Sequence, residues 1–344
     1  MNNLVKLAVP AGLAVLLSAC GQSGTMNTLP GSGAQSQSQA HQLAAKSVAP
    51  LQDGLQLGRI YMPLVGQQKV QKDLSGALDW GGGDVQHNPT IYVIYWGLTA
   101  KSCGKTFGKT QACDPDNIRP TLESFLTNVG GSAWQSTVTQ YYDNNGDIQD
   151  PTGQFVTDGT GKGKKAGECV GTGTHCMFDK KIPAETYPTD YEVQQEAKKL
   201  VDQFGANPNA SYVVQTPWGH NESGFGTSWC AYHGAFTYDK TVIAYTYMPY
   251  MPEAGSSCGA NFVNKGAAGT LDGVTIVEGH ELEETQTDPN PPSGWYGSGG
   301  EIGDLCAWNK ATSNQPFGNN TTFPVQPLWS DVANACTLTG PSGP

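Results

Sequence analysis

The amino-acid sequence predicts an α+β fold, in which a mixed β-sheet packs on helices and glycine-rich loops are joined by disulfides. Strand-like and helix-like segments are interspersed along the chain in an order typical of α+β proteins. The 344 residues include 44 glycines and only 14% charged residues, as in a loop-rich exported protein. Of the nine cysteines, eight follow Cys20, and an even number in an exported chain favours disulfides.

Three segments predict buried strands, because they are rich in β-branched and aromatic residues. They span residues 90–97, 211–216 and 241–247. Two further segments predict helices from the spacing of their apolar residues. These are residues 118–129, with Leu122, Phe125 and Leu126 on one face, and residues 191–204, which end before Gly205.

The start of the chain has the pattern of an export signal. Residues 1–19 combine Lys6, an apolar run and small residues before Cys20, as in a bacterial lipoprotein signal peptide. An ordinary secretory signal cleaved nearby is the alternative. Residues 20–52, rich in Ser, Gln, Gly and Ala, predict a flexible tether behind a lipidated Cys20. Without an internal repeat or a second linker, residues 53–344 are expected to form one zincin-like domain, for the reasons given below.

Composition and charge narrow the choice of partners. The net charge of −11 and the lack of a basic patch argue against binding to nucleic acid. The apolar run of the signal is short for a transmembrane helix, so the expected attachment to a membrane is the lipid on Cys20. We therefore expect an exported bacterial lipoprotein at the cell envelope or outer surface. The sequence leaves its oligomeric state open.

Neighbouring cysteines are expected to pair with one another. Eight cysteines allow on the order of 100 pairings, so the sequence alone does not fix the connectivity. Pairing of nearest neighbours closes four local loops: Cys103–Cys113, Cys169–Cys176, Cys230–Cys258 and Cys306–Cys336. A zinc site built from cysteines is the weaker alternative, because the chain contains no C-x-x-C pair.

The segment from Asp272 to Cys306 is expected to carry the functional chemistry. Its apolar start predicts a helix, which Pro289 ends. His280 and Glu284 are four residues apart, so both side chains leave one face of the helix and together can hold a metal ion. Glu281 stands where the general base stands in the zincin motif H-E-x-x-H, whose second histidine is here Glu284. The order of strands and helices is also broadly that of a zincin.

A third protein ligand must come from outside this helix. We expect Glu301, with Asp304 a close second and Asp288 a third candidate. Asp288 precedes a proline, which turns its backbone away from helix, so it can instead accept a hydrogen bond from His280. One histidine and two carboxylates suit a divalent metal. Zinc is the ion that we expect, and manganese or calcium are the alternatives.

The acidic helix also has an interpretation without a metal site, in which His280 binds no ion. It is one solvated face formed by four glutamates: Glu278, Glu281, Glu283 and Glu284. The cluster of Trp295, Glu301 and Asp304 that follows at once favours the metal site instead.

Three of the histidines outside this helix and one acidic segment are further candidates. His233, in the segment CAYHGAF, and His220 can orient a substrate or add a ligand, but a histidine with satisfied hydrogen bonds is the more frequent case. His175, beside Cys176, is expected to be structural. The oxygen-rich residues 143–147 (DNNGD) lack the spacing of an EF-hand, so we expect a turn there and not a calcium loop.

The combined pattern of this region resembles one family. GHELEETQTDP, followed by GWYG and GEIGDLC, resembles the signature of plant EXORDIUM (phosphate-induced protein 1) proteins and their bacterial relatives. The matching residues are His280, Glu281, Glu284, Thr287, Asp288, Pro289, Trp295, Tyr296, Glu301, Ile302, Asp304, Leu305 and Cys306. The segments YVIYWG, QYYD, CAYH and QPLWS extend the likeness over roughly residues 90–336. The resemblance implies a secreted protein that acts at the cell wall and has a zincin-like fold, but no particular reaction.

The function that we expect is a metal-dependent hydrolase, anchored at the surface or secreted, and within that class a peptidase. Glu281 would activate water beside the ion, and three side chains would line the cleft: His233, Trp295 and Tyr296. The alternative is a non-catalytic lipoprotein that binds the cell wall or a glycan and uses the ion structurally. A third hypothesis is a glycan hydrolase that uses Glu281 and Glu301 as its two carboxylates.

Overall fold

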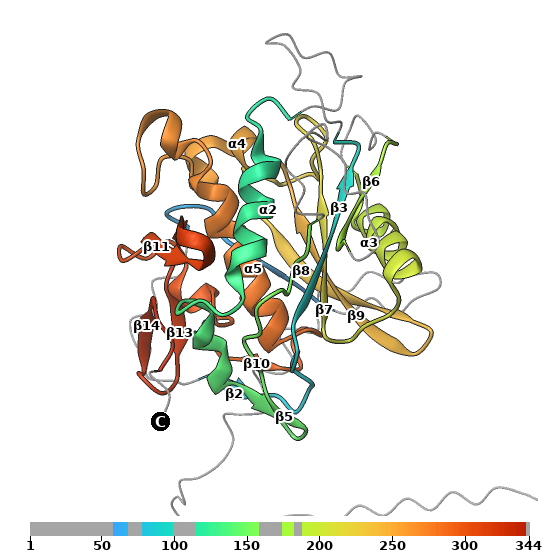
Figure 1. The fold of residues 1–344 in the computed structure, drawn as a ribbon, viewed down its shortest axis with the longest axis vertical. Coiled ribbons are helices and arrows are strands. Elements are labelled where there is room, and N and C mark those ends of the chain that lie inside the picture. Colours follow the sequence, from blue (N-terminus) through green and yellow to red (C-terminus); the bar gives the residue numbers. More distant parts are fainter. Residues whose placement is uncertain (1–57, 68–77, 99–113, 158–173, 182–187, 342–344) are drawn as a thin grey trace, which may run out of the picture. The chain divides into compact units, whose positions relative to one another are not determined.

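The fold is that of a computed structural model, which describes residues 58–67, 78–98, 114–157, 174–181 and 188–341 (Figure 1). Internal contacts divide the chain into two units, and every described residue belongs to the second unit, Ser47–Pro344. The predicted signal peptide, the lipidation of Cys20 and the tether fall outside the described residues. Within these ranges, no helix combines the length and the apolar character needed to cross a membrane.

A six-stranded mixed sheet forms the centre of the fold, in the order β1-β8-β9-β7-β3-β6. Its strands are β1 (Arg59–Tyr61), β3 (Thr90–Trp96), β6 (Cys176–Asp179), β7 (Ala210–Gln215), β8 (Tyr232–Tyr238) and β9 (Thr241–Met248). Strands β6, β3, β7 and β9 run parallel, whereas β8 pairs antiparallel with β9 and β1 antiparallel with β8. The mixed sheet and the three predicted strands are confirmed, and β1, β6 and β8 are additions to them.

Helices cover both faces of this sheet (Figure 1). Helices α2 (Ile118–Val129) and α5 (Asp272–Thr287) lie on one face and α3 (Asp190–Phe204) on the other. Successive side chains of a strand point to opposite faces, so Val93 packs in the core with α2 and α5 while Ile94 packs in the core with α3. This layered packing of helices on a mixed sheet confirms the predicted α+β class.

The two helices predicted from apolar spacing form with nearly the predicted bounds. In α3, the Thr189 side chain accepts a hydrogen bond from the Glu192 backbone N–H, and the Glu192 side chain accepts one from the Thr189 backbone N–H. The helix ends at Gly205, whose φ of 95° favours glycine. The predicted apolar face of α2 is fully buried. Local sequence therefore defines both of these helices.

Shorter elements connect these layers. Four small antiparallel sheets pair β2 (Asp79–Trp80) with β10 (Trp295–Tyr296), β4 (Tyr142–Asp143) with β5 (Gly146–Asp147), β11 (Ser313–Phe317) with β12 (Thr321–Val325), and β13 (Leu328–Ser330) with β14 (Ala335–Thr337). The short helices are α4 (Met251–Ala254), η2 (Gln135–Gln140), η3 (Gly255–Cys258), η4 (Gly266–Gly269), η5 (Asp304–Cys306) and η6 (Gly318–Asn320). The DNNGD segment is the β4–β5 hairpin, which confirms the predicted turn.

Helix α5 is buried along its whole length, and every residue from Asp272 to Thr287 belongs to the interior. It contacts strands β7, β8 and β9, helices α2 and η2, and strand β12. A Cβ on Gly279 would lie 2.9 Å from the Trp134 ring, so a glycine is needed where η2 crosses the helix. The solvated acidic face is therefore wrong, because all four glutamates of the helix are buried. The predicted end before Pro289 is confirmed.

Two of the four predicted disulfides are confirmed. Cys230 is bonded to Cys258 and Cys306 to Cys336. The predicted pairs 103–113 and 169–176 each include a cysteine outside the described residues, so these two pairings stay predictions.

Candidate metal centre

Three separate segments bring six polar side chains together inside the fold. Helix α5 contributes three of them, strand β8 one, and the turn that leads into η5 two. They are His280, Glu281 and Glu284 from α5, His233 from β8, and Glu301 and Asp304 from the turn. Five of these residues are buried, and only the Asp304 side chain, 15% exposed, reaches the surface to a measurable extent. The site is therefore buried, and it is partly exposed to solvent at Asp304.

The side chains form two groups that share Glu284, and in each group one ligand atom from each of the three residues lies within 4.8 Å of the others. In the first, His280 Nε2 lies 3.1 Å from Glu284 Oε1 and 3.6 Å from Asp304 Oδ1. In the second, His233 Nδ1 lies 3.6 Å from Glu284 Oε2, and His233 Nε2 lies 3.5 Å from Glu301 Oε2. Two ligands bound tetrahedrally at zinc distances lie about 3.4 Å apart. Both groups could therefore hold an ion.

Many polar atoms of these groups are buried without a hydrogen bond. They are both ring nitrogens of His280, Nε2 of His233, Oε2 of Glu284, and both carboxyl oxygens of Glu301. Buried polar atoms are rarely left in this state, because the loss of hydration costs free energy that only a partner offsets. A cation in each group would supply that partner for one ring nitrogen of each histidine and for the carboxyl oxygens that face it, so the residues fit a metal ion.

The electrostatics of the cluster are those of crowded carboxylates around two histidines. Burial acts to raise the pKa of Glu284, but the His280 and His233 rings outweigh it and hold the pKa below its usual value. Burial, followed by the charge of Glu284, holds the pKa of Glu301 well above its usual value. Burial lowers the pKa of His233 to about 4, which keeps its ring neutral and able to bind a metal.

Glu281 lies at the edge of both groups. Its Oε2 is 3.2 Å from His233 Nδ1, and its Oε1 is buried without a hydrogen bond. Burial, followed by repulsion from Glu284, raises the pKa of Glu281 well above its usual value. A carboxyl group whose pKa is raised by burial is typical of general acid–base catalysts.

The backbone around Gly303 holds the first group in place. The Asp304 backbone N–H donates to Glu284 Oε1 at 2.9 Å, and Gln326 Nε2 donates to the Gly303 carbonyl at 2.8 Å. Burial acts to lower the pKa of the His280 ring, but Glu284 and, to a smaller extent, Asp304 and Gln326 outweigh it and raise the pKa. A Cβ on Gly303 would lie 2.7 Å from His280 Nδ1, so this turn passes directly against the ligands.

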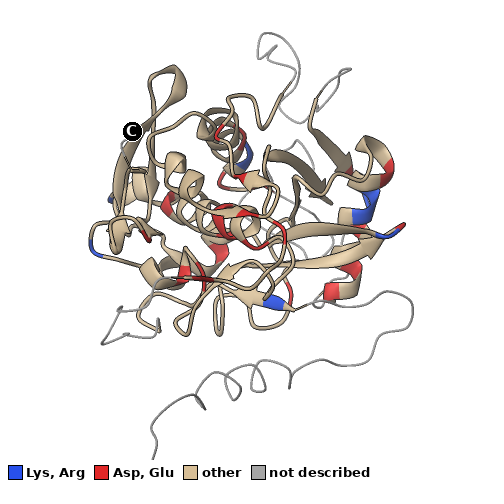
Figure 2. Cartoon of the chain, turned by 90° about the horizontal axis from the view of Figure 1, so that it is seen from below, with Lys and Arg blue, Asp and Glu red and all other residues tan. Residues whose placement is uncertain are grey.

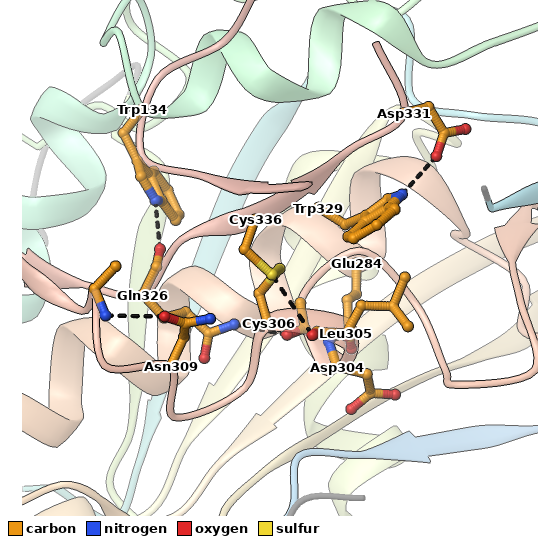
Figure 3. Close-up of a disulfide and its surroundings, with 12 residues drawn as sticks. Trp134, Glu284, Asp304, Leu305, Cys306, Asn309, Gln326, Trp329, Asp331 and Cys336 are labelled. Atoms are coloured by element: carbon orange, nitrogen blue, oxygen red, sulfur yellow. Dashed lines mark hydrogen bonds between the residues drawn. A yellow bond between two sulfur atoms is a disulfide. The ribbon is translucent and has the colours of Figure 1, made fainter. Parts of the chain in front are cut away.

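Disulfides anchor the segments that bring in the outer ligands. Figure 3 shows Asp304 and Leu305 directly beside the bond between Cys306 and Cys336. The second bond, between Cys230 and Cys258, begins three residues before His233. Each outer segment is thus tied covalently near the point where it meets α5.

Asp288, the third candidate ligand, has other surroundings than expected. Asp288 does not lie against His280: its Oδ1 accepts hydrogen bonds from the backbone of Ser293 and Gly294, and its carboxyl group neighbours Glu301. Burial raises the pKa of Asp288 to about 6. Asp288 thus adds a fifth carboxyl group to the cluster, on the side of Glu301.

The aromatic residues of β10 pack within the fold. Trp295 is buried between Tyr141 and Tyr142, and its indole N–H donates to the Tyr142 carbonyl. Tyr296 pairs with Asp79 of β2. The Trp295 ring is therefore engaged in packing, so the expected cleft is not lined by a free tryptophan.

His233 is the residue whose position the sequence analysis described least well. It was expected to orient a substrate or to add a ligand. It lies within strand β8, opposite Thr246 of β9, and close to Glu284 and Glu301, where it can add a ligand. The alternation of side chains along residues 232–238 would have signalled a strand, but Gly234 and Ala235 weaken that pattern. The other two histidines lie outside both groups: His175 contacts the Gln154 carbonyl, and His220 is buried in a loop.

The charge distribution agrees with a cation site. Acidic positions gather near the centre of the cartoon in Figure 2, whereas the few Lys and Arg positions are scattered. Among the described residues, the carboxyl groups of the cluster that lie within 4.0 Å of a basic side chain do so with the His233 and His280 rings. Comparison with known proteins gives no match of any kind: no protein family, no curated protein and no solved structure is significantly similar to the chain.

Proposed function

We propose that the protein is a metal-dependent hydrolase, and within that class a peptidase. The observation that supports it is the meeting of His280, Glu284 and Asp304 around one point, with Glu281 beside them and buried ligand atoms that lack hydrogen bonds. Zinc fits one histidine and two carboxylates at these separations, and manganese or calcium fit the oxygen ligands.

The residues have distinct roles in this proposal. An ion in this group supplies Lewis-acid chemistry, which polarises water and the carbonyl of the bond to be cleaved. Glu281 accepts the proton of the attacking water at Oε1 and passes it to the leaving amine. The contact of Glu281 Oε2 with His233 holds the carboxyl group in this orientation. The substrate approaches from the side of Asp304, where the cluster meets the surface.

The test of this function is Glu281→Gln, which keeps the size of the side chain and removes its basicity. We expect hydrolysis of an unfolded protein substrate to fall by about 10²–10⁴-fold, the usual contribution of a general base. Metal content, measured by elemental analysis, should stay the same. Glu283→Gln is the matched control, since Glu283 is also buried on α5 but lies outside both groups. Equal activity of Glu281→Gln and the wild type contradicts the proposal.

The burial of the cluster favours a second candidate, a non-catalytic lipoprotein that binds the cell wall or a glycan. Structural metal sites are closed, whereas catalytic ones keep an open position, and here only Asp304 is partly exposed. In that case the protein binds polysaccharide, hydrolyses nothing, and loses stability but not ligand specificity when the ion is removed. Binding to insoluble polysaccharide that survives Glu281→Gln, with no hydrolysis, supports this candidate over the first.

Both candidates are proposed for an exported relative of the EXORDIUM family, on the motif from His280 to Cys306 and the lipoprotein pattern before Cys20. A lipid on Cys20 would hold the protein on a membrane through the tether. Fractionation of cells that express the full chain tests this: recovery in the membrane fraction agrees with the anchor, and recovery in the soluble fraction contradicts it.

A further inference from the structure

The two carboxyl oxygens of Glu284 face different neighbours. Oε1 lies near His280 and accepts a hydrogen bond from the Asp304 backbone, whereas Oε2 lies near His233 and makes no hydrogen bond. One carboxylate that presents one oxygen to each of two ligand groups has the arrangement of a bridge between two metal ions. Such paired ions lie about 3.5–4 Å apart in hydrolytic enzymes.

The second group has its own buried atoms without partners. His233 Nε2 and both oxygens of Glu301 make no hydrogen bond, and both residues are at most 1% exposed. When His233 Nδ1 donates its proton to Glu281 Oε2, Nε2 keeps its lone pair and points to Glu301. In this tautomer, His233 Nε2 and the carboxyl oxygens of Glu301 are free to bind an ion, and the first ion uses none of them.

A second divalent cation would also offset more of the negative charge that the carboxyl groups carry when they are ionised. The cluster contains five carboxyl groups: Glu281, Glu284, Asp288, Glu301 and Asp304. When all five are ionised they carry −5, so one divalent ion leaves −5 + 2 = −3 and two ions leave −5 + 4 = −1. A buried residual charge of −3 is strongly disfavoured at low dielectric. Two ions leave a charge that the neighbouring N–H groups can offset.

We propose that the centre holds two divalent metal ions bridged by Glu284, the second of them bound by His233, Glu284 and Glu301. This inference rests on the metal centre of the proposed function, but not on hydrolysis. Two bridged ions would allow attacking and leaving groups to be stabilised at the same time. They also explain why one buried helix and two disulfide-anchored segments converge on a single glutamate.

The test measures how many ions the purified full chain binds and whether they interact. Manganese is titrated into metal-free protein, bound ions are counted by equilibrium dialysis, and low-temperature electron paramagnetic resonance reports magnetic coupling. We expect two ions per chain and a coupled spectrum. His233→Ala should bind one ion with an uncoupled spectrum, and Glu284→Gln should lose the coupling. Glu283→Gln, the matched control on the same helix, should keep two coupled ions.

Two results overturn the inference: saturation of the wild type at one ion, or two uncoupled ions that persist in His233→Ala. If His233→Ala does not fold, as judged by circular dichroism, the spectrum and stoichiometry of the wild type alone decide. The outcome is also separable from the proposed function. One bound ion together with hydrolysis that depends on Glu281 would support the proposed hydrolase and contradict the second ion. Two coupled ions without hydrolysis would support the second ion and contradict the hydrolase.

Discussion

At the scale of single residues, the missing side chain of Gly303 shapes the metal centre. Its backbone is helical, with φ −82° and ψ −42°, so alanine is allowed there by backbone conformation. A Cβ would nevertheless lie 2.7 Å from His280 Nδ1 and 2.9 Å from Glu284 Oε1. Gly303 is therefore required by the proximity of two ligands and not by the turn.

Gly303→Ala should consequently weaken metal binding. The methyl group displaces His280 or Glu284, and misplaced ligands lower metal affinity by about 10–100-fold. Isothermal titration with zinc measures the change. Gly58→Ala is the control, since its Cβ would lie equally close, 2.9 Å, to the Pro291 carbonyl, away from the ligands. Both variants should have a lower free energy of unfolding. An equal loss of zinc affinity in both variants would contradict the specific role of Gly303 beside the metal ligands.

The sequence predicts a residue of the site when its partners are close to it in sequence, and not when they come from distant segments. His280, Glu281 and Glu284 follow from helical spacing alone, and Glu301 and Asp304 lie close behind in sequence. Their division into two groups does not follow, because it depends on which oxygen of Glu284 each one faces. His233 is 47 residues before His280 and reaches the site only through the pairing of β8 with β9.

At the scale of elements, α5 shows why burial is harder to predict than helix bounds. Its end before Pro289 follows from backbone chemistry. Its acidic residues suggested a solvated face, because ionised carboxylates are rarely buried. The helix is enclosed by strands, helices and loops from distant parts of the sequence, which no local pattern encodes. Burial raises the pKa of Glu278 to about 8, which shows how strongly this enclosure acts on a carboxyl group.

The disulfide from Cys306 to Cys336 holds the turn with Glu301 and Asp304 against α5 (Figure 3). Replacing both cysteines by serine frees a segment with a sequence separation of 30. We expect the free energy of unfolding to fall by about 3–4 kcal/mol, from the loop-closure entropy of the unfolded chain. Zinc affinity should fall as well, because two ligands lose their anchor. Urea unfolding and zinc titration measure the two effects.

The other disulfide supplies the comparison for this prediction. The pair Cys230 and Cys258 has a similar sequence separation of 28, so its removal should cost a similar free energy. It anchors β8, so its loss should act on the ion bound by His233 more than on the ion bound by His280. Wild-type zinc affinity in the variant that lacks Cys306 and Cys336 would show that the turn is held without the disulfide.

At the scale of the whole molecule, the sequence predicted which segments form strands and helices better than it predicted how these elements are arranged in the sheet. The three predicted strands, β3, β7 and β9, lie side by side inside the sheet, and their largely buried apolar residues give a strong pattern. The strands that were not predicted, β1, β6 and β8, lie at or next to the edges and include short or glycine-containing segments. Strand order and register are set by contacts between distant segments, which explains why they could not be predicted.

The stability of the whole molecule should depend on metal and on pH together. In metal-free protein, burial holds the pKa of Asp288 at about 6 and of Glu278 at about 8, above their unfolded values. The folded state then binds more protons than the unfolded chain, so the free energy of unfolding should fall as pH rises from about 4.5 to 8. Bound ions offset this effect at the ligands, because they bind only the folded site and favour ionised carboxylates.

Removal of metal with a chelator should therefore lower the midpoint of thermal unfolding more at pH 8 than at pH 5. At a free metal concentration 100 times the dissociation constant, each ion adds about 2.7 kcal/mol to the free energy of unfolding. Burial, followed by the charge of Glu284, raises the pKa of Glu301, so protons compete with the ions for this carboxyl group more strongly at the lower pH. Calorimetry of chelated and zinc-loaded protein at both pH values measures the difference. An equal shift at pH 5 and pH 8 would mean that the ion binds away from these buried carboxylates.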